Sequence, residues 1–240
     1  MGCLLRKVKY FRDEDIDEDG GFAEVYGKCR DYTLTSKERM YALYKAVRYV
    51  VDAKIPGDFV ECGLWRGGSS MLMAYSLMGC ADAGRKLYLY DTFAGMPEPT
   101  VKDVALDGSD AMGTWRRKGG NGGSRWGYVS QEEVEANLKS TGYPASGLVF
   151  VKGMVEDTMP ATLPSRVALL RLDTDFFDST RHELIHMYPL LSQRGVLIVD
   201  DYGYWRGARA AVDGYFKENN VKMLLDRVDY TGRIGVKTSA

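Results

Sequence analysis

Short apolar runs alternate with segments of helical periodicity along most of this chain, and this alternation limits the possible folds more than any other feature. Runs such as "DFVECG", "KLYLYD" and "VALLRLD" have the length and composition of buried strands. Strands that alternate with helices form parallel sheets whose two faces are covered. A chain of 240 residues with this pattern predicts one α/β domain with helices on both faces of its sheet.

The end of the chain breaks this alternation. "KMLLDRVD" and "RIGVKT" both have strand composition, and only a few residues separate them. A connection this short leaves room only for a hairpin, so we expect the last strand to run antiparallel. Among the helices, Ser36, Ser130 and Ser179 are the predicted N-caps.

Two segments lie outside the regular pattern. Residues 1–31 are charged and irregular and include "RDEDIDEDGG", which favours a mobile or docking arm. Residues 93–128 are rich in Gly and Pro, and so long a connection in a compact domain is typical of a lid or an insertion. We therefore expect an N-terminal arm and a covering helix over 1–57, and a catalytic domain over 58–240 that carries an insertion at about 93–128.

Composition excludes several classes of protein. The net charge is −1 and the isoelectric point is about 6.2, which gives no electrostatic reason to expect nucleic acid or an anionic membrane as partner. The four cysteines stand apart without a CxxC pair, which is typical of free thiols in a reducing compartment. No apolar run reaches the length of a membrane span or of a signal-peptide core. We expect a cytoplasmic protein.

Acidic residues stand at the ends of four of the predicted strands. Glu61 and Asp91 end the first two, Asp173 ends "VALLRLD", and the doublet Asp200-Asp201 ends "VLIVDD". Ligands of open parallel sheets bind outside the carboxyl ends of the strands. These acids are therefore expected to face a binding site.

The segment "VECGLWRGGSS" predicts a glycine-rich turn from a strand into a helix. Such a turn lets a ligand approach the backbone, and the helix N-terminus favours a negative group. It matches neither GxGxxG nor a phosphate-binding loop, so by itself a purely structural turn is an equal alternative. Asp91, at the end of the next strand, can accept hydrogen bonds from ribose hydroxyls. Together the two features indicate a cofactor that contains adenosine.

Asp173, Asp200 and Asp201 form a second group. Neighbouring strands lie roughly 4.8 Å apart, so these carboxylates would repel one another unless a cation lay among them. Hard oxygen ligands favour Mg²⁺, Mn²⁺ or Ca²⁺, and the alternative is that one or more of these acids caps a helix. Asp175 is equally compatible with a base that faces the substrate and with a solvated turn residue.

Other candidates remain open on spacing alone. His182 and His186 have a spacing that metal ligands use, but they lack the Glu of HExxH, so we interpret them as surface or packing residues. Aromatic residues near the acids are compatible with either a substrate pocket or the core: Phe176, Phe177, Tyr202, Tyr204 and Trp205.

Several of these segments together resemble the macrocin O-methyltransferase family, from about Tyr32 to the C-terminus. The segments are "VECGLWRGGSSM", "YDTFAGMP", "VKGMVEDTMP", "LLRLDTDFFDST" and "VLIVDDYG". Members of that family use S-adenosylmethionine and a divalent metal to methylate sugar hydroxyls of antibiotics. The resemblance implies a class I methyltransferase fold, with a Rossmann-like, seven-stranded, mostly parallel sheet whose last strand is antiparallel.

The resemblance also implies roles for individual residues. The turn from Glu61 to Ser70 would hold the methionine part of S-adenosylmethionine, and Asp91 would hold its ribose. Asp175 would be the general base. The remaining implied contacts are Thr33, Glu61, Gly63, Ser69 and Ser70 toward the cofactor, Gly153, Val155 and Glu156 near its adenine, and Asp173, Asp200 and Asp201 toward Mg²⁺.

The expected function is therefore Mg²⁺-dependent O-methylation of a hydroxyl on a sugar or glycosylated small molecule. The alternatives are a phenolic or catechol-like acceptor, an NAD-dependent oxidoreductase, which the absence of GxGxxG opposes, and a non-catalytic cofactor-binding module. The insertion departs from the family motifs, and its aromatic and basic residues are candidates for acceptor binding: Trp115, Arg116, Arg117, Arg125 and Trp126. We expect a homodimer.

Overall fold

A central sheet organises the molecule, for which a computed structural model describes residues 14–120 and 123–238. The described strands of this sheet have the order β5-β2-β1-β6-β7-β9-β8. Neighbours from β5 to β7 are parallel, which confirms the predicted parallel core. The strands are β1 (Asp58–Cys62), β2 (Leu87–Asp91), β5 (Leu148–Lys152), β6 (Val167–Leu172), β7 (Leu191–Val199), β8 (Asp226–Arg227) and β9 (Arg233–Val236).

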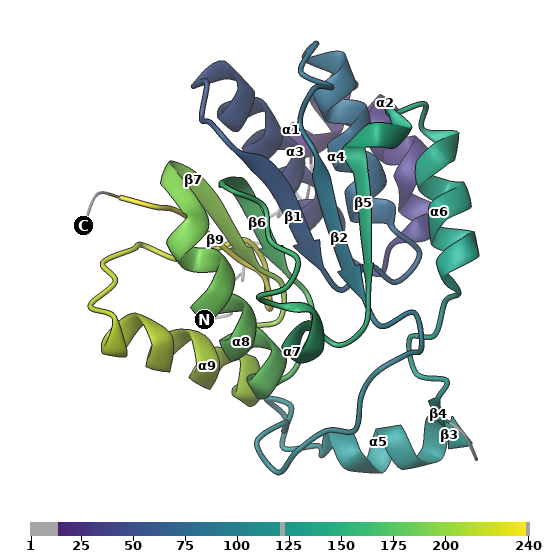
Figure 1. Ribbon diagram of the computed structural model, residues 1–240, viewed down its shortest axis with the longest axis vertical. Helices are drawn as coiled ribbons and strands as arrows, with labels where there is room; N and C mark the ends of the chain where they lie inside the picture. Colours follow the sequence, from purple (N-terminus) through teal and green to yellow (C-terminus); the bar gives the residue numbers. More distant parts are fainter. Residues whose placement is uncertain (1–13, 121–122, 239–240) are drawn as a thin grey trace, which may run out of the picture.

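Helices cover both faces of this sheet (Figure 1). Successive side chains of a strand point to opposite faces, so Phe59 joins one apolar core and Val60 the other. The first core contains buried residues of α3, α4 and α6, and the second contains those of α8 and α9. These and the short helix after β5 are α3 (Lys37–Asp52), α4 (Gly68–Gly79), α6 (Gln131–Ser140), α7 (Val155–Thr158), α8 (Phe177–Met187) and α9 (Arg206–Glu218).

The C-terminal hairpin confirms the antiparallel last strand. β9 pairs antiparallel with β7, with Leu197 opposite Gly235, and β8 pairs antiparallel with β9. The predicted strand over residues 222–229 is much shorter in the structure, because only Asp226 and Arg227 pair. Met223 and Leu225 before them pack against the second apolar core without joining the sheet.

The prediction of an irregular arm over residues 1–31 is wrong for its described part. Residues 14–29 form α1 (Glu14–Glu18) and α2 (Gly20–Cys29), whereas residues 1–13 lie outside the described chain. Asp15, Asp17 and Glu18 are exposed. Phe22 is fully buried, and its ring centroid lies 5.0 Å from that of Tyr41 and 5.6 Å from that of Tyr44. A few apolar anchors in a charged segment are enough to dock it.

The predicted insertion lies beyond the carboxyl ends of the strands and carries structure of its own (Figure 1). It contains α5 (Ala111–Lys118) and a small hairpin of β3 (Gly119–Gly120) and β4 (Gly123–Ser124). It is fastened to the domain by Ala105, which pairs with Trp205, and by the buried carboxylate of Asp103.

Asp103 also explains why the predicted cap of α8 is wrong. The helix begins at Phe177 after Phe176, two residues before Ser179. The amide of Phe177 donates to Oδ1 of Asp103 at 2.9 Å, so a distant residue satisfies this helix end. The Ser179 hydroxyl instead donates to the carbonyl of Phe176 at 3.2 Å.

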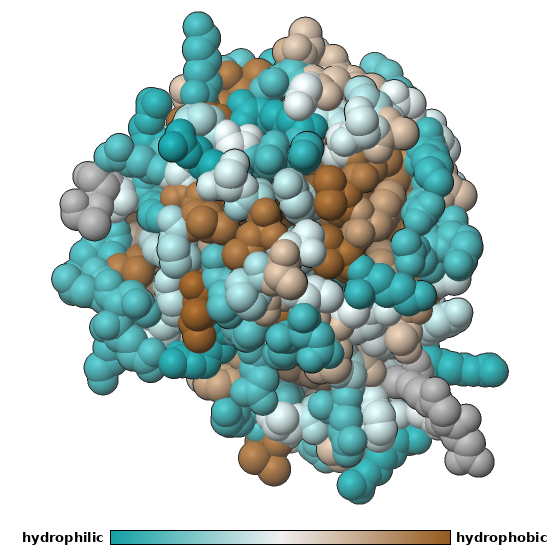
Figure 2. Space-filling model, viewed as in Figure 1, coloured by the Kyte–Doolittle hydropathy of each residue, from teal (hydrophilic) through white to brown (hydrophobic). Residues whose placement is uncertain are grey.

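The surface drawn in Figure 2 is hydrophilic over much of its area, with apolar side chains near its centre and over β5. β5 is an edge strand, and its Val149 and Phe150 remain partly exposed. None of the helices in the described part of the chain is long and apolar enough to cross a bilayer.

Candidate active site

A cavity opens at the carboxyl ends of β1, β2, β5, β6 and β7, where the sequence predicted the site. Its walls also include Arg39 from α3 and Met96 and Trp126 from the insertion. The predicted site residues that line it are Thr33, Gly63, Ser69, Asp91, Gly153, Val155, Glu156, Asp173, Asp175, Asp200 and Asp201.

The turn between β1 and α4 needs its glycines. Gly63 has φ of +84°, and a Cβ on it would lie 2.0 Å from the carbonyl oxygen of Asp173. Gly67 has φ of +85° and directly precedes α4, whose Ser69 lines the cavity. The turn thus lies close against the strand end that carries the acids, and it leaves backbone accessible from the cavity.

Asp91 connects this turn to the end of β2. Its Oδ2 accepts from the amide of Leu64 at 2.7 Å, and its Oδ1 accepts from the amide of Phe93 at 2.7 Å. Burial raises the pKa of Asp91, and these amides oppose that shift. Each carboxylate oxygen has a second lone pair, so the group can still accept ligand hydroxyls from the cavity.

Glu61 and Ser70 do not line the cavity. Glu61 is 1% exposed, accepts from the Ser70 hydroxyl, and forms an ion pair of 2.6 Å with Arg171. Burial raises its pKa, and the charge of Arg171 opposes the shift. The geometry therefore gives Glu61 a structural partner in place of a direct contact with the cavity.

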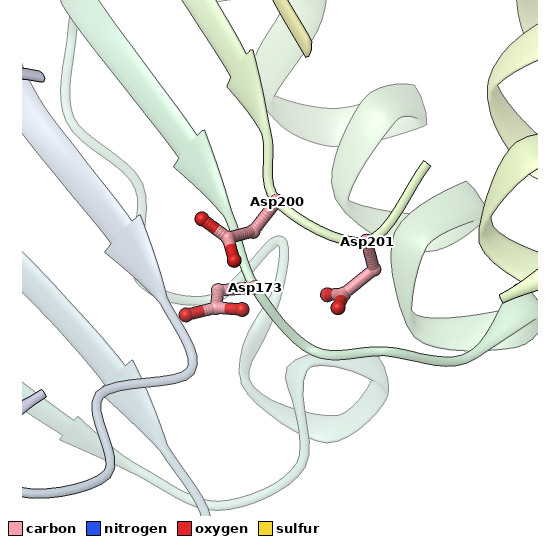
Figure 3. A group of neighbouring side chains, drawn as sticks. All are labelled: Asp173, Asp200 and Asp201. Carbon is pink, nitrogen blue, oxygen red and sulfur yellow. The ribbon is translucent and has the colours of Figure 1, made fainter. Parts of the chain in front are cut away.

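Three carboxylates converge beside the turn (Figure 3). Asp173 follows β6, Asp200 and Asp201 follow β7, and one oxygen of each lies within 4.8 Å of the others. Burial raises the pKa of Asp173 and of Asp201 well above the usual range, and the neighbouring carboxylates add to this shift. The cluster favours a positive charge among its oxygens.

Two arginines, the buried Arg171 and the partly buried Arg39, supply part of that charge. Arg171 lies 2.7 Å from Asp173 and 2.5 Å from Asp200. Arg39 forms a second ion pair with Asp200 and one of 3.0 Å with Asp229. Sequence reasoning missed both. Arg171 had a signal, since a charge inside the apolar run "VALLRL" must find an acid when it is buried.

The donor set nevertheless fits a hard divalent cation. Asp201 makes no ion pair with a described residue, and the second lone pairs of Asp173 and Asp200 remain available as ligands. The cluster has no His or Cys donor, so its chemistry suits Mg²⁺, Mn²⁺ or Ca²⁺ better than zinc.

Asp175 occupies a strained position at the cavity wall. Its φ is +68°, its amide donates to Oδ2 of Asp201 at 3.1 Å, and its Oδ1 accepts from Nε1 of Trp205 at 2.7 Å. Burial and the charge of Asp173 raise the pKa of Asp175 to about 7. A carboxylate with this pKa is suited to proton transfer near neutral pH.

A buried acid, Glu183, contacts Thr174 of the cavity wall but does not itself line the cavity. Glu183 of α8 is fully buried, and its Oε1 accepts from the Thr174 hydroxyl at 2.9 Å. Burial raises the pKa of Glu183 well above its usual value. His182, its neighbour, contacts the carbonyl of Met159 at 3.2 Å and does not line the cavity, consistent with a packing role.

The sheet order, the antiparallel C-terminal hairpin and the acidic cavity at the strand ends define the fold of the class I methyltransferases. Residues 25–235 match the model of the macrocin O-methyltransferase (TylF) family, and the chain belongs to that family of enzymes. The predicted resemblance and fold class are both confirmed.

Characterised relatives agree with this membership. The chain is 33% identical to the 8-demethyl-8-(2,3-dimethoxy-alpha-L-rhamnosyl)-tetracenomycin-C 4'-O-methyltransferase of Streptomyces olivaceus, over 87% of this chain and 77% of that protein. It is 31% identical to the demethyldecarbamoylnovobiocin O-methyltransferase of Streptomyces niveus, over 87% and 79%. The solved O-methyltransferase NovP superposes with a TM-score of 0.75 at 30% identity, covering 87% of this chain and 83% of NovP.

Proposed function

We propose that this enzyme transfers a methyl group from S-adenosylmethionine to a hydroxyl of a sugar carried by a small molecule, with Mg²⁺ at its acidic cluster. The observation that carries the proposal is one cavity that is lined both by a glycine turn and Asp91 and by Asp175 and three carboxylates. Donor, base and metal ligands then lie within reach of one acceptor.

The cofactor is assigned to the β1–α4 end of the cavity. The Gly63 turn would hold the methionine part, Asp91 would accept from the ribose, and Gly153, Val155 and Glu156 would flank the adenine. Thr33 lies on the same wall, which supports a covering role for the segment before α3. Bound S-adenosylmethionine would supply an activated methyl group.

Asp175 is assigned to the proton of the acceptor. Its carboxylate would receive that proton as the acceptor oxygen bonds to the methyl carbon and the bond from that carbon to the cofactor sulfur breaks. Two hydrogen bonds hold Asp175 in place, one from its own backbone amide to Asp201 and one from the indole N–H of Trp205 to its carboxylate. Little reorganisation is therefore needed during proton transfer. A Mg²⁺ ion on Asp173, Asp200 and Asp201 would acidify and orient a hydroxyl beside it.

The acceptor class is supported by the family and by one relative named for a rhamnosylated tetracenomycin. We propose a screen of methyl transfer over rhamnosides, other glycosylated polyketides and simple catechols, with Mg²⁺ or EDTA. Turnover of glycosides that stops in EDTA supports the proposal. Turnover of catechols alone contradicts the sugar acceptor, and turnover unaffected by EDTA contradicts the metal role.

Cofactor binding is tested separately by calorimetry with S-adenosylhomocysteine. We expect binding in the absence of metal, because the residues assigned to the cofactor, such as Asp91 and Gly153, are different from the three assigned to the metal. Absence of binding would contradict the methyl donor itself.

A further inference from the structure

Trp205 is the point where the insertion, the acidic cluster and Asp175 meet. Its backbone amide donates to the carbonyl of Asp201 at 3.0 Å, and it pairs with Ala105 of the insertion. The flanking residues extend this pairing, since Leu106 donates to the carbonyl of Tyr204 at 2.8 Å. The backbone of Trp205 is therefore fixed from two sides.

The indole ring is fixed as well. Trp205 is 5% exposed, and its ring centroid lies 5.7 Å from that of Phe176 and 6.2 Å from that of Trp126. Trp126 belongs to the insertion and lines the cavity, whereas Phe176 directly follows Asp175. The three rings form a cluster in which the insertion packs against the turn that carries Asp175.

The indole N–H of this fixed ring points at Asp175. It donates to Oδ1 at 2.7 Å, a short distance typical of a hydrogen bond to a charged acceptor. A donor from Arg or Lys would add a positive charge beside the carboxylate and weaken it as a base. The indole is neutral and is only a donor, so it restrains the carboxylate without forming an ion pair.

We propose that Trp205 is a positioning residue for methyl transfer, which orients the Asp175 carboxylate through its indole N–H and couples that orientation to the docked insertion through Trp126. This inference rests on the proposed role of Asp175 as base. Trp205 does not line the cavity and is not assigned any contact with the acceptor. Its effect should therefore fall on kcat and not on binding.

The decisive variant replaces Trp205 with 3-benzothienylalanine, which exchanges the indole N–H for sulfur and keeps the shape of the ring. We expect kcat to fall about 10- to 100-fold, the cost of a misplaced catalytic group. The acceptor KM, the affinity for S-adenosylhomocysteine and the melting temperature should remain within about two-fold or a few degrees of wild type. Trp205→Phe should show the same loss of kcat with an added loss of stability, because it also removes ring area.

Tyr204→Phe is the matched control. The ring centroids of Tyr204 and Trp205 lie 5.0 Å apart, and Tyr204 is 41% exposed. The substitution removes a single hydroxyl beside the site. We expect wild-type kinetics. A benzothienyl variant with wild-type kcat would overturn the inference, as would a loss of kcat that Tyr204→Phe reproduces.

A second readout needs no acceptor. The chain has 4 tryptophans, so a ¹H–¹⁵N spectrum of the full protein has few indole resonances, and the one missing in Trp205→Phe is assigned to Trp205. Asp175→Asn should move that resonance upfield, because a neutral amide is the weaker acceptor. An unmoved resonance would contradict the hydrogen bond.

Asp175→Asn also separates this inference from the proposed function. If Asp175→Asn retains wild-type turnover, the base assignment fails and the role of Trp205 fails with it. If Asp175→Asn is inactive while the benzothienyl variant is fully active, the base assignment stands and the inference about Trp205 alone is wrong.

Discussion

The three clustered carboxylates differ in how much of their charge the protein already compensates. Asp200 is paired with both Arg39 and Arg171, whereas Asp201 makes no ion pair with a described residue and accepts from the amide of Asp175. An Asn at either position removes a ligand charge. Only at Asp200 does it also leave the buried Arg171 and the partly buried Arg39 short of a partner.

We therefore predict that Asp201→Asn lowers methyl transfer roughly 100-fold or more and abolishes its Mg²⁺ dependence, with little change in stability. Asp200→Asn should lose activity as well, and should lower the free energy of unfolding by about 3 kcal/mol or more. Calorimetry with Mg²⁺ and urea denaturation measure the two effects. Equal stability losses in both variants would contradict this division.

Glu183 provides a prediction about pH. It is fully buried, one of its oxygens has no hydrogen-bond partner among the described residues, and burial raises its pKa well above 4.5. The folded state therefore binds a proton that the unfolded state releases. The stability associated with this proton is present at low pH and declines as pH rises from the unfolded toward the folded pKa.

Glu183→Gln keeps an acceptor for the Thr174 hydroxyl and cannot ionise. Relative to this variant, the wild type should lose up to about 1.4 kcal/mol of unfolding free energy for each pH unit in that window. Urea denaturation at about pH 5, 7 and 9 checks the prediction. If the free energies of unfolding of the two proteins changed with pH in the same way, the pKa of Glu183 would be the same in the folded and unfolded states, which contradicts the prediction.

At the scale of elements, the β1–α4 turn, to which we assign the cofactor, packs against the strand end that carries the acidic cluster. A methyl on Gly63 would meet the carbonyl of Asp173, whereas a methyl on Gly79 at the end of α4 would meet no atom within 4 Å. Gly63 in the turn before α4 and Gly79 at the end of α4 can therefore be compared as a test position and its control.

Gly63→Ala should cost about 3 kcal/mol or more of unfolding free energy and should weaken binding of S-adenosylhomocysteine, because the turn must move. Gly79→Ala should stabilise the protein by about 0.5–1 kcal/mol and leave binding unchanged. Thermal denaturation and calorimetry check both. A Gly63→Ala variant that binds normally would show that the turn does not contact the cofactor.

Elements with a local signal could be predicted from the sequence, and those fixed by distant partners could not. The buried strands and the helix after Ser36 have periodicity and caps within their own residues, and the structure has them close to where they were predicted. The start of α8 was misplaced because its cap comes from Asp103, far away in the chain. The helix α2 was missed because a few apolar residues, Phe22 and Cys29 among them, dock it after a strongly acidic stretch that masks its pattern.

At the scale of the whole molecule, topology made most of the site predictable. Once the strands are parallel, their carboxyl ends share an edge, and the acids that end them must meet there. The ion pair between Arg171 and Glu61 joins the neighbouring strands β6 and β1, and it depends on the register of these strands, which no local pattern specifies. The partner of Glu61 could not be read from the sequence for this reason.

The cavity also draws its walls from distant parts of the chain, and this gives a prediction for the whole molecule. Thr33 and Thr35 before α3, Asp91 at the end of β2 and Gly153 after β5 all line it. Thr35 is tied to the acidic cluster, because its hydroxyl accepts from Arg171 at 3.0 Å. A cofactor between these walls should therefore restrain segments that are remote in sequence.

We predict that S-adenosylhomocysteine slows hydrogen exchange at residues 33–36 as well as at 63–70, 91–96 and 153–156. At 100 times its Kd it should add about 2.7 kcal/mol to the free energy of unfolding, because only the folded chain has all the walls. Exchange measured by mass spectrometry, with and without ligand, checks the pattern, and Asp91→Ala should reduce it everywhere. If protection reached 63–70 and 91–96 but not 33–36, the segment before α3 would line the cavity without covering the cofactor.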